Sequence, residues 1–599
     1  MATATAPTTP KARLLLLPVA AFLVTLPLLL HGCSCGHDFD FHLQSWLEAA
    51  NQFRHRALLP RWAFSPAWNS GEPRFVFYPP LSWLLGAIIT MLFGLTAAPI
   101  LFTWITLTAA AFTMYRLARE FASPNAALLA AALYIANPYM LFTAFERTAY
   151  GELLAAAWLP LLILAALREQ PTIPSIAVPL ALLWLTNAPA AVIGSYAFAA
   201  IIAIRLGLLL LRPQRIYLPP MGSADAPAPH PPTPVELVSR SIAGTGLGLA
   251  LAAFYLLPAA YERRYVQIAM ALIQNMRFQD NFLFGHTGDG PHDQVLHTAS
   301  LIAVTILAST LVISGAPYLR RSRRMSGKPK LSLILITLTL LITLLLTPIT
   351  TPLWNHLPEL SFLQFPWRMI ALQGVLLALA AALLLNRTRL PYLAATGTVV
   401  ALTLTLTFTA NHLYRQGCEL FDGPAARADL FATHHGVDST DEYTPGEADN
   451  DVLRWDNPAY WLADSPKAFA PNTIPNPAAT IINYDQPHPM EQNVTDQAPM
   501  HFTVHANHPE YLILHLRDYP NWQVAEGCET CRFFKRLSHI TRDDGLLAVA
   551  LPTGDDTINI TWHRSWDEEL GSTLSVLAFV TLLVLSGISL RSRRLKTEQ

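Results

Sequence analysis

Charged residues are scarce in this 599-residue sequence, where Asp, Glu, Lys and Arg together make up 14%, against about 25% in soluble proteins. An excess of positive charge is also absent, because 40 Lys and Arg face 41 Asp and Glu; this balance argues against a nucleic-acid binder. Long apolar runs fill residues 12–410, whereas most acidic residues lie between 411 and 570. This pattern excludes a soluble multidomain enzyme and a disordered chain. It predicts a polytopic α-helical membrane protein with one water-facing domain.

Thirteen apolar runs are candidates for membrane-spanning helices, since a bilayer core needs roughly 20 apolar residues per crossing. The first follows Lys11 and Arg13 and is interpreted as a retained helix rather than a cleaved signal peptide. The runs lie near residues 14–30, 78–95, 98–115, 126–144, 153–167, 175–193, 194–211, 240–258, 297–315, 331–349, 368–385, 391–410 and 571–590.

The charges flanking these runs favour twelve crossings over thirteen. Basic residues precede the first run and follow the last, from Arg591 to Lys596, so both termini are predicted to lie in the cytoplasm and the number of crossings is even. Arg116 and Arg119 fall on the cytoplasmic side only if 78–95 does not cross. That run begins with two prolines after Tyr78, as expected of a helix lying on the membrane surface. Fourteen crossings, with one run split in two, remain the alternative.

This topology defines three parts of the chain. Residues 1–410 form a multi-span membrane domain with a first outer loop at 32–97, and further outer segments at 145–152, 259–295 and 350–367. Residues 411–570 form an extracytoplasmic domain, and residues 571–599 form the final helix and a basic cytoplasmic tail. The predicted location is a bacterial inner membrane.

Alternating apolar residues predict four strands in the extracytoplasmic domain, at 501–505, 511–516, 546–551 and 557–562. They indicate a small antiparallel β-sandwich before the last helix. Residues 420–500, rich in Pro, Asn and Asp, are predicted to be long loops.

The five cysteines, Cys33, Cys35, Cys418, Cys528 and Cys531, all fall outside in this topology, which suits an oxidising compartment. Cys528 and Cys531 are interpreted as a small structural disulfide rather than a zinc half-site or a redox pair. The odd number leaves at least one free thiol.

Candidate chemistry begins in the first outer loop, where apolar residues recur at helical spacing from Phe39 onward. Asp38 and His42 fall on one face of this helix and Asp40 on another. Such carboxylates commonly cap a helix start, but their place directly after the first membrane helix favours a catalytic role. No metal site is predicted, although His37 with these three residues leaves a divalent cation as an alternative.

A series of short motifs resembles the membrane glycosyltransferases of GT-C type and, more closely, bacterial membrane proteins labelled 6-pyruvoyl-tetrahydropterin-synthase-related. The likeness covers about residues 12–410. Its motifs, besides Asp38 with His42, are Leu59-Pro-Arg-Trp62, Gly71-Glu-Pro73, Phe77-Tyr-Pro-Pro-Leu81, Glu146-Arg147 with Glu152, and Gln364-Phe-Pro-Trp-Arg368.

This resemblance implies an enzyme that moves a sugar from a polyprenyl-phosphate donor to an extracytoplasmic glycan or lipid of the cell envelope. Asp38 would be the general base. The substrate-binding residues would be Arg74, Tyr78, Glu146, Arg147, Glu152 and Arg368, with the arginines stabilising charge on the leaving phosphate. Several such enzymes carry a Lys where this chain has Tyr78, and Arg74, one turn earlier, is the expected substitute.

Other interpretations of these residues stay open. Arg147 could form a local ion pair with Glu146, and Arg368 could anchor the chain at the membrane interface beside Trp367. Residues 262–264, Glu-Arg-Arg, are predicted to be a solvated face.

Two other functions also remain. A transporter or flippase would explain the break at Thr186-Asn-Ala-Pro-Ala190, although no internal repeat relates two halves of the chain, and a third alternative is a non-catalytic envelope assembly protein. The sugar, the acceptor, the stereochemistry and the oligomeric state do not follow from the sequence.

Overall fold

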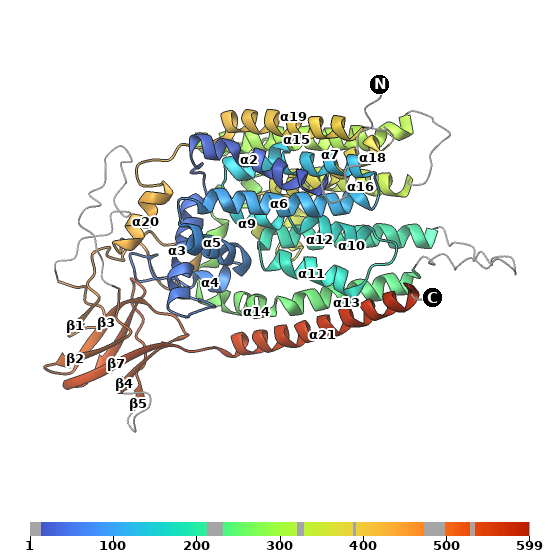
Figure 1. Cartoon of the computed structure of the whole chain (residues 1–599). Coiled ribbons are helices and arrows are strands. Elements are labelled where there is room, and N and C mark those ends of the chain that lie inside the picture. Colours follow the sequence, from blue (N-terminus) through green and yellow to red (C-terminus); the bar gives the residue numbers. More distant parts are fainter. Residues whose placement is uncertain are drawn as a thin grey trace.

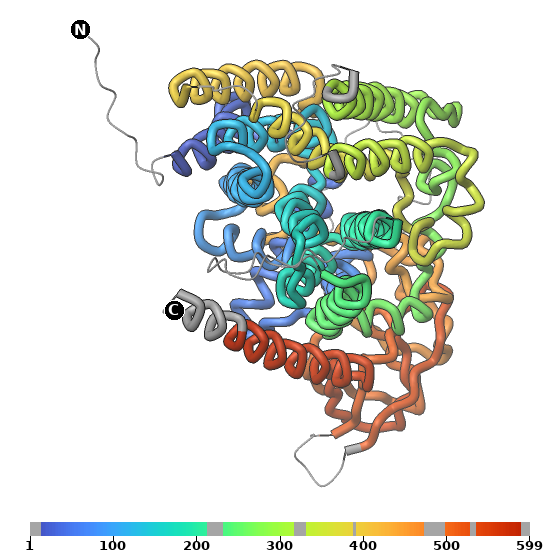
Figure 2. Tube along the Cα trace, turned by 90° about the vertical axis from the view of Figure 1, so that its right-hand side faces the viewer, coloured from blue at the N-terminus to red at the C-terminus, as the bar shows by residue number. Residues whose placement is uncertain are grey.

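The computed structural model describes residues 13–211, 232–319, 329–386, 391–471, 497–527 and 534–597. It is mostly helical, with a small β region at one end of a helical body (Figure 1). The last helix runs from the β region along the side of the body to the opposite end (Figures 1 and 2). Cys528 and Cys531, predicted to form a disulfide, lie outside the described residues.

The helices of the first half are short and often broken by proline. They are α2 (Leu16–His31), α3 (Phe39–Arg54), α4 (Arg74–Phe77), α5 (Pro80–Phe93), α6 (Ala98–Arg119), α7 (Pro124–Ile135), α8 (Pro138–Phe145), α9 (Tyr150–Ala155), α10 (Leu159–Leu167), α11 (Ile173–Trp184) and α12 (Ala188–Leu211).

The second half contains the longest helices. They are α13 (Pro234–Leu251), α14 (Ala253–Glu262), α15 (Gly290–Leu319), α16 (Pro329–Leu345), α17 (Thr351–His356), α18 (Ile370–Leu385), α19 (Tyr392–Tyr414), α20 (Pro424–Ala432) and α21 (Trp566–Thr597). Short 3-10 turns lie between them, among which η2 (Ile268–Leu272), η5 (Ser361–Leu363), η6 (Pro366–Met369) and η7 (Asp441–Tyr443) matter below.

Within the described residues, seven helices are long and apolar enough to cross a membrane, or ten if three bent helix pairs each count as one crossing. Helix α5 is not among them, because its 14 residues extend only roughly 21 Å at 1.5 Å per residue. It occupies the predicted surface run 78–95. Helices α2 and α11 are also apolar, but they too are shorter than the seven long helices.

Several predicted runs differ from the helices of the structure. Runs 126–144, 240–258 and 331–349 are each a pair of helices, and the two helices of each pair are bent relative to one another by 40°, 75° and 87° respectively. Runs 175–193 and 194–211 do not divide where predicted, because α12 already begins at Ala188 and continues for 24 residues. The Asn187 side chain accepts a hydrogen bond from the backbone N–H of Ala190 at 2.9 Å, which starts α12 in the manner of a helix cap.

The β region contains two antiparallel sheets. One has the order β1-β3-β6 and the other β2-β7-β4-β5. The strands are β1 (Tyr460–Ala463), β2 (His501–Ala506), β3 (Glu510–Arg517), β4 (Trp522–Gly527), β5 (Phe534–Arg536), β6 (Leu546–Leu551) and β7 (Gly554–Trp562). Apolar residues of both sheets share one core. The four predicted strands are therefore present as β2, β3, β6 and β7.

The prediction of long loops over 420–500 is wrong in part, since α20 and β1 fall there. The predicted bounds 411–570 for the domain between the last two long helices also differ slightly from the structure. Helix α19 continues to Tyr414 and α21 begins at Trp566, so both helices enter this range.

The loop of residues 32–97 packs directly on the β region. The Trp62 ring lies 5.8 Å from Tyr519, 5.6 Å from Trp522 and 5.9 Å from Trp562, measured between ring centroids. Glu262 is also buried there, where it accepts a 2.6 Å hydrogen bond from the Tyr519 hydroxyl. The prediction of a solvated face is therefore wrong for Glu262.

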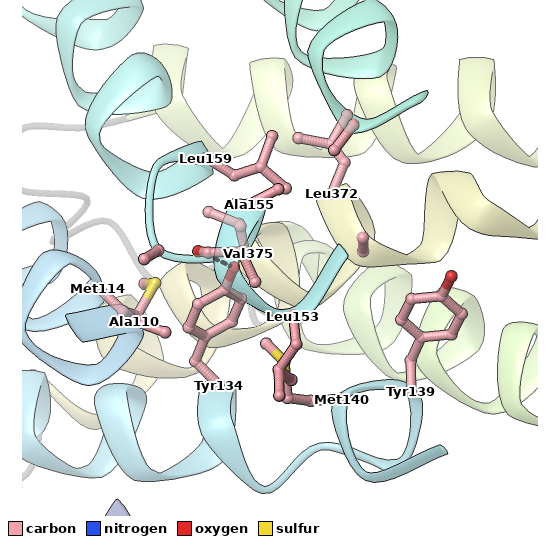
Figure 3. Packing of buried hydrophobic residues seen from close by; sticks show 14 of the residues in the cluster. Ala110, Met114, Tyr134, Tyr139, Met140, Leu153, Ala155, Leu159, Leu372 and Val375 are labelled. Carbon is pink, nitrogen blue, oxygen red and sulfur yellow. Dashed lines mark hydrogen bonds between the residues drawn. The ribbon is translucent and has the colours of Figure 1, made fainter. Parts of the chain in front are cut away.

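The helical core lies where α6, α7, α9, α10 and α18 meet (Figure 3). In Figure 3, Tyr134 and Met114 point toward Ala155, Leu159 and Val375. The Tyr134 hydroxyl donates a 2.7 Å hydrogen bond to the Ala156 carbonyl, which satisfies a polar group where α9 ends. This core fixes α8 and α9, and the short connection between them carries several predicted site residues.

Candidate functional site

A cavity of about 920 Å³ lies at the end of the helical body that faces the β region. Its wall brings together segments far apart in the chain: the residues before α3, the turn between α8 and α9, one side of α15, η6, the end of α19 and η7. The charged and polar lining residues are His37, Asp38, Glu146, Arg147, Asn281, His292, Gln294, Gln364, Arg368, Gln416, Asp441 and Glu442. Four of the predicted site residues, Asp38, Glu146, Arg147 and Arg368, are among them.

The segment before α3 is held against the turn between α8 and α9. Gly36 approaches that turn so closely that an added Cβ would lie 2.1 Å from the Glu146 carbonyl oxygen, so only glycine fits. The backbone N–H of Asp38 donates to the Arg147 carbonyl at 2.9 Å. A disulfide between Cys35 and Cys418 ties the same segment to the chain after α19. These contacts fix the position of the backbone at Asp38, and hence where its carboxylate can reach.

Asp38 immediately precedes α3, yet its side chain makes no capping hydrogen bond to that helix. The carboxylate is 42% exposed and lies 3.6 Å, Oδ2 to Nη2, from Arg147. The capping interpretation of Asp38 is therefore wrong. Its carboxylate is instead part of the cavity wall.

Arg147 and Arg368 belong to one chain of alternating charges. Arg147 Nη1 lies 2.6 Å from Glu152 Oε2, and Arg368 Nε lies 3.8 Å from the same oxygen. Tyr139 donates to the other Glu152 oxygen at 2.5 Å. Burial disfavours the Arg147 cation, but the Glu152 and Asp38 carboxylates outweigh it and raise the pKa of Arg147 above its ordinary value. Arg147 is therefore a permanent cation.

The predicted alternatives for these two arginines do not fit the structure. Arg147 pairs with Glu152 and Asp38 rather than with Glu146, whose pKa is raised by burial. Trp367 is 3% exposed and lies beneath the Arg147 guanidinium, 4.9 Å from it. A Trp buried in this way is not an interface anchor, and Arg368 beside it faces the cavity.

Arg368 retains unused donor capacity. Its Nη1 donates to the Leu363 carbonyl at 2.8 Å and to the Gln364 side chain at 3.2 Å, which fixes the guanidinium. Its buried Nε–H has no hydrogen-bond partner among the described residues. The acceptor nearest to this Nε–H is Glu152 Oε2, at 3.8 Å, beyond hydrogen-bond distance.

Asp40 and His42, predicted as catalytic, do not line the cavity. Asp40 is 56% exposed and lies 3.8 Å from Arg427 of α20. His42 is buried among the rings of Phe41, Tyr78, Trp46 and Tyr150. Burial lowers the pKa of His42 to about 4, so its ring is neutral at neutral pH. The bond between His42 and Asp38 is the helical one from the His42 backbone N–H to the Asp38 carbonyl at 3.2 Å, and among the described residues no hydrogen bond joins the His42 ring to the Asp38 carboxylate, so the prediction that His42 orients this carboxylate is not supported.

Arg74 and Tyr78, predicted to bind the donor phosphate, also lie outside the cavity wall. Arg74 is 3% exposed, and its guanidinium contacts Glu72 at 2.7 Å, Thr440 at 3.2 Å and Ser45 at 3.3 Å. The prediction that Arg74 replaces a missing lysine is therefore wrong. Arg74 instead holds the segment just before η7. Tyr78 is half-buried, and the loss of hydration at its hydroxyl raises its pKa.

The alternative of a divalent cation finds no support in this loop. Asp40 lies beside Arg427, and His42 is buried among aromatic rings. Among the described residues no group of three or more His, Cys, Asp or Glu side chains is placed to hold a metal ion.

Sequence reasoning missed the lining residues His292, Asp441 and Glu442. The first lies near the start of α15 and the other two lie in η7, within the stretch predicted as loops. Burial raises the pKa of Glu442, with the nearby Glu72 and Asp441 carboxylates adding to the effect. No local pattern marks these residues, because only the tertiary fold brings them to the cavity.

Comparison with known proteins finds no matching family model, and no curated protein matches the chain. The cavity and its residues are therefore the features that point to a function.

Proposed function

We propose that this protein is a membrane glycosyltransferase that moves a sugar from a polyprenyl-phosphate donor to an extracytoplasmic acceptor. The observation that carries the proposal is the convergence of Asp38, Arg147 and Arg368 on one cavity. These residues come from three separate segments that the resemblance to GT-C enzymes had already singled out. The cavity volume of about 920 Å³ lies near the upper end of the usual range for ligand sites.

The residues present suit each part of the transfer. Asp38 takes the proton from an acceptor hydroxyl, and the resulting oxygen attacks the anomeric carbon of the donor sugar. The bond between that carbon and the phosphate oxygen breaks, and polyprenyl phosphate leaves with the electron pair. Arg147 and Arg368, which both line the cavity, stabilise the negative charge that develops on the leaving phosphate.

Glu152 positions the two arginines rather than contacting substrate in this proposal. It is 7% exposed and lies between both guanidinium groups. A buried carboxylate shared in this way keeps two like charges close together. The cavity wall therefore carries both guanidinium groups close together, with the Asp38 carboxylate beside Arg147.

The proposed topology has twelve crossings in a bacterial inner membrane, with the cavity on the extracytoplasmic side and both termini in the cytoplasm. The seven long helices and three bent pairs, together with α2 and α11, supply the twelve, and α5 lies on the surface. The large apolar area exposed along α21 supports a lipid environment for this helix.

The transporter alternative receives less support from the structure. At the break between α11 and α12, Thr186 accepts a 3.0 Å hydrogen bond from Trp158, and Asn187 caps α12. The polar groups of this break are thus used within the protein, whereas a transport site needs them for substrate. An assembly protein, the third alternative, would not need a cavity with paired cations.

The decisive experiment measures release of polyprenyl phosphate from synthetic polyprenyl-phosphate monosaccharides by purified protein. Asp38→Asn keeps the size of the side chain but removes the proton acceptor, so turnover should fall about a hundredfold or more. Asp40→Asn is the matched control, because Asp40 lies two residues away and outside the cavity wall. Normal turnover by Asp38→Asn would refute the proposed base, and no release by the unmodified protein with any donor or acceptor would refute the function.

A further inference from the structure

The cavity wall carries more acidic than basic side chains. Its two guanidinium groups, those of Arg147 and Arg368, both lie beside the buried Glu152 carboxylate. The lining itself contributes four more carboxylates, which are Asp38, Glu146, Asp441 and Glu442. Two cations thus face five carboxylates, and an excess of negative charge remains on the wall. A bound cation would reduce this excess.

Two of these carboxylates lie in η7 and have no cationic partner of their own. Asp441 accepts a 2.9 Å hydrogen bond from the Asn450 side chain, and neither Asp441 nor Glu442 forms an ion pair with any residue that the structure describes. Burial raises the pKa of Glu442. The nearby cation, Arg74, is already paired with Glu72 at 2.7 Å. The charge of η7 is therefore free to act on a ligand.

The acidic turn belongs to one continuous side of the cavity. Turn η2 packs on both η7 and η5, and η3 (Phe278–Asp280) packs on η5 as well. The Gln364 side chain, which follows η5, donates to the Ala271 carbonyl of η2 at 2.8 Å. This side therefore runs from the carboxylates of η7 through η2 and η5 to Asn281, which directly follows η3.

Asn281 gives a second, independent indication of a ligand on this side. It lines the cavity and is 1% exposed. Its Nδ2 donates to the carbonyls of Asn275 at 2.8 Å and Arg277 at 2.9 Å, which fixes the orientation of the amide. Its Oδ1 has no hydrogen-bond partner among the described residues. A buried acceptor of this kind needs a donor, which an ammonium or a hydroxyl group supplies and an ionised phosphate does not.

We propose that this side of the cavity, from Asp441 and Glu442 to Asn281, binds an amino sugar as the acceptor, with its ammonium group on the carboxylates. This inference rests on the proposed function, because it assigns the acceptor of the same transfer. The excess of negative charge identifies the ammonium group, and the transfer requires a hydroxyl that Asp38 can deprotonate. An amino sugar carries both groups on one ring. An ethanolamine phospholipid headgroup has the ammonium group but no hydroxyl, and it adds a phosphate.

Binding can be measured without transfer, by saturation-transfer NMR on the full-length protein in phosphatidylcholine nanodiscs. Methyl glucosaminide carries the ammonium group and should bind about tenfold more tightly than methyl glucoside, which has a hydroxyl in its place. Glu442→Gln keeps the size of the side chain but removes its charge, so this preference should largely disappear. Glu447→Gln is the matched control, because Glu447 is exposed on the same segment but does not line the cavity.

Asp441→Asn is a second, independent variant. The asparagine oxygen can still accept the hydrogen bond from Asn450, so the turn should keep its structure while the preference for methyl glucosaminide falls. Equal binding of the two glycosides by the unmodified protein would overturn the inference, and so would a preference in both η7 variants as large as that in Glu447→Gln.

Transfer provides a separable test. With one polyprenyl-phosphate sugar as donor, the ratio of turnover with methyl glucosaminide to turnover with methyl glucoside should fall about tenfold in Glu442→Gln. An unchanged ratio would overturn the amino-sugar site while leaving the transferase proposal intact. Tighter binding of methyl glucosaminide without transfer from any donor would have the opposite meaning, because the ammonium site would stand and the transferase proposal would fall.

Discussion

At the scale of single residues, His42 is a histidine held neutral by its neighbours. It lies on α3 with four aromatic rings around it, the nearest being Tyr150 at 5.3 Å between centroids. Its Nδ1 has no hydrogen-bond partner among the described residues. A charged imidazolium in this place would lose its hydration without gaining a compensating carboxylate contact.

This burial predicts a dependence of stability on pH. The pKa of His42 is about 4 in the folded protein, against an ordinary value of 6.5. The unfolded chain therefore binds the proton more readily than the folded protein does. The contribution of neutral His42 to the free energy of unfolding is thus present above pH 6.5 and is lost as the pH falls toward 4. The free energy of unfolding should drop by about 3 kcal/mol over this interval from His42 alone.

The measurement is thermal unfolding of the protein and of His42→Phe between pH 7.5 and 4.5. Phenylalanine fits an aromatic cluster and does not titrate, so the variant should lose stability less steeply than the unmodified protein. His55→Phe, at the exposed end of the same helix, should keep the original slope. Identical slopes for the protein and His42→Phe would contradict the assignment.

At the scale of elements, the segment before α3 determines where Asp38 lies. Its close contact at Gly36 leaves no room for a side chain. Gly36→Ala should therefore shift the segment away from Arg147 and destabilise the protein by about 1–3 kcal/mol. Sugar transfer should fall with it, because the distance between Asp38 and Arg147 would increase.

The matched control is Gly417→Ala, on the segment that the disulfide joins to this one, since a Cβ at Gly417 would meet nothing within 4 Å. Thermal unfolding and transfer should both be unchanged in that variant. Full activity and stability in Gly36→Ala would mean that the segment can move without displacing Asp38.

Elements with a regular pattern could be predicted from the sequence, and those defined by tertiary contacts could not. Strands β2 and β7 alternate apolar and polar residues, and β3 and β6 are short apolar runs bounded by turn residues, so the sequence indicates all four. Strands β1, β4 and β5 are short or lack this alternation. The bends in the helices escaped prediction because an apolar run continues through them.

The residues of the candidate site also fall into those that the sequence could predict and those that it could not. Asp38, Arg147 and Arg368 were identifiable because they belong to the motifs of the resemblance and lie at the ends of apolar runs, where a costly charged group tends to face a cavity. Arg74 was misassigned, because its partner Thr440 is distant in the sequence and nothing local shows that the guanidinium is occupied. Asp441 and Glu442 were not predicted for the same reason, because they are far in the sequence from the other residues that line the cavity.

At the scale of the whole molecule, the disulfide between Cys35 and Cys418 joins two parts separated by 383 residues. It links the end of α2 to the end of α19 and closes almost the entire helical body into one loop. Replacing both cysteines by serine should lower the free energy of unfolding by about 2–5 kcal/mol. The comparison is thermal unfolding with and without a dithiol reductant, which should lower the stability of the unmodified protein more than that of the double variant.

Cys33→Ser is the control, because Cys33 is a free thiol. It should unfold like the unmodified protein and remain sensitive to the reductant. A double Cys35→Ser, Cys418→Ser variant of unchanged stability would show that the hydrogen bonds around Ser34 and Gln416 suffice to hold the two segments together.

The long separation between these two cysteines has a consequence for biosynthesis. Cys35 leaves the ribosome hundreds of residues before its partner exists, with Cys33 two residues away as a competing thiol. Cys418 Sγ lies 3.6 Å from the carbonyl oxygen of Cys33, so the wrong pairing is within reach when Cys418 arrives. The correct bond can form only after α19 has been inserted and packed beside α2. Its oxidation is therefore a late event that reports completed assembly, and cells deficient in disulfide isomerisation should accumulate the Cys33-linked form.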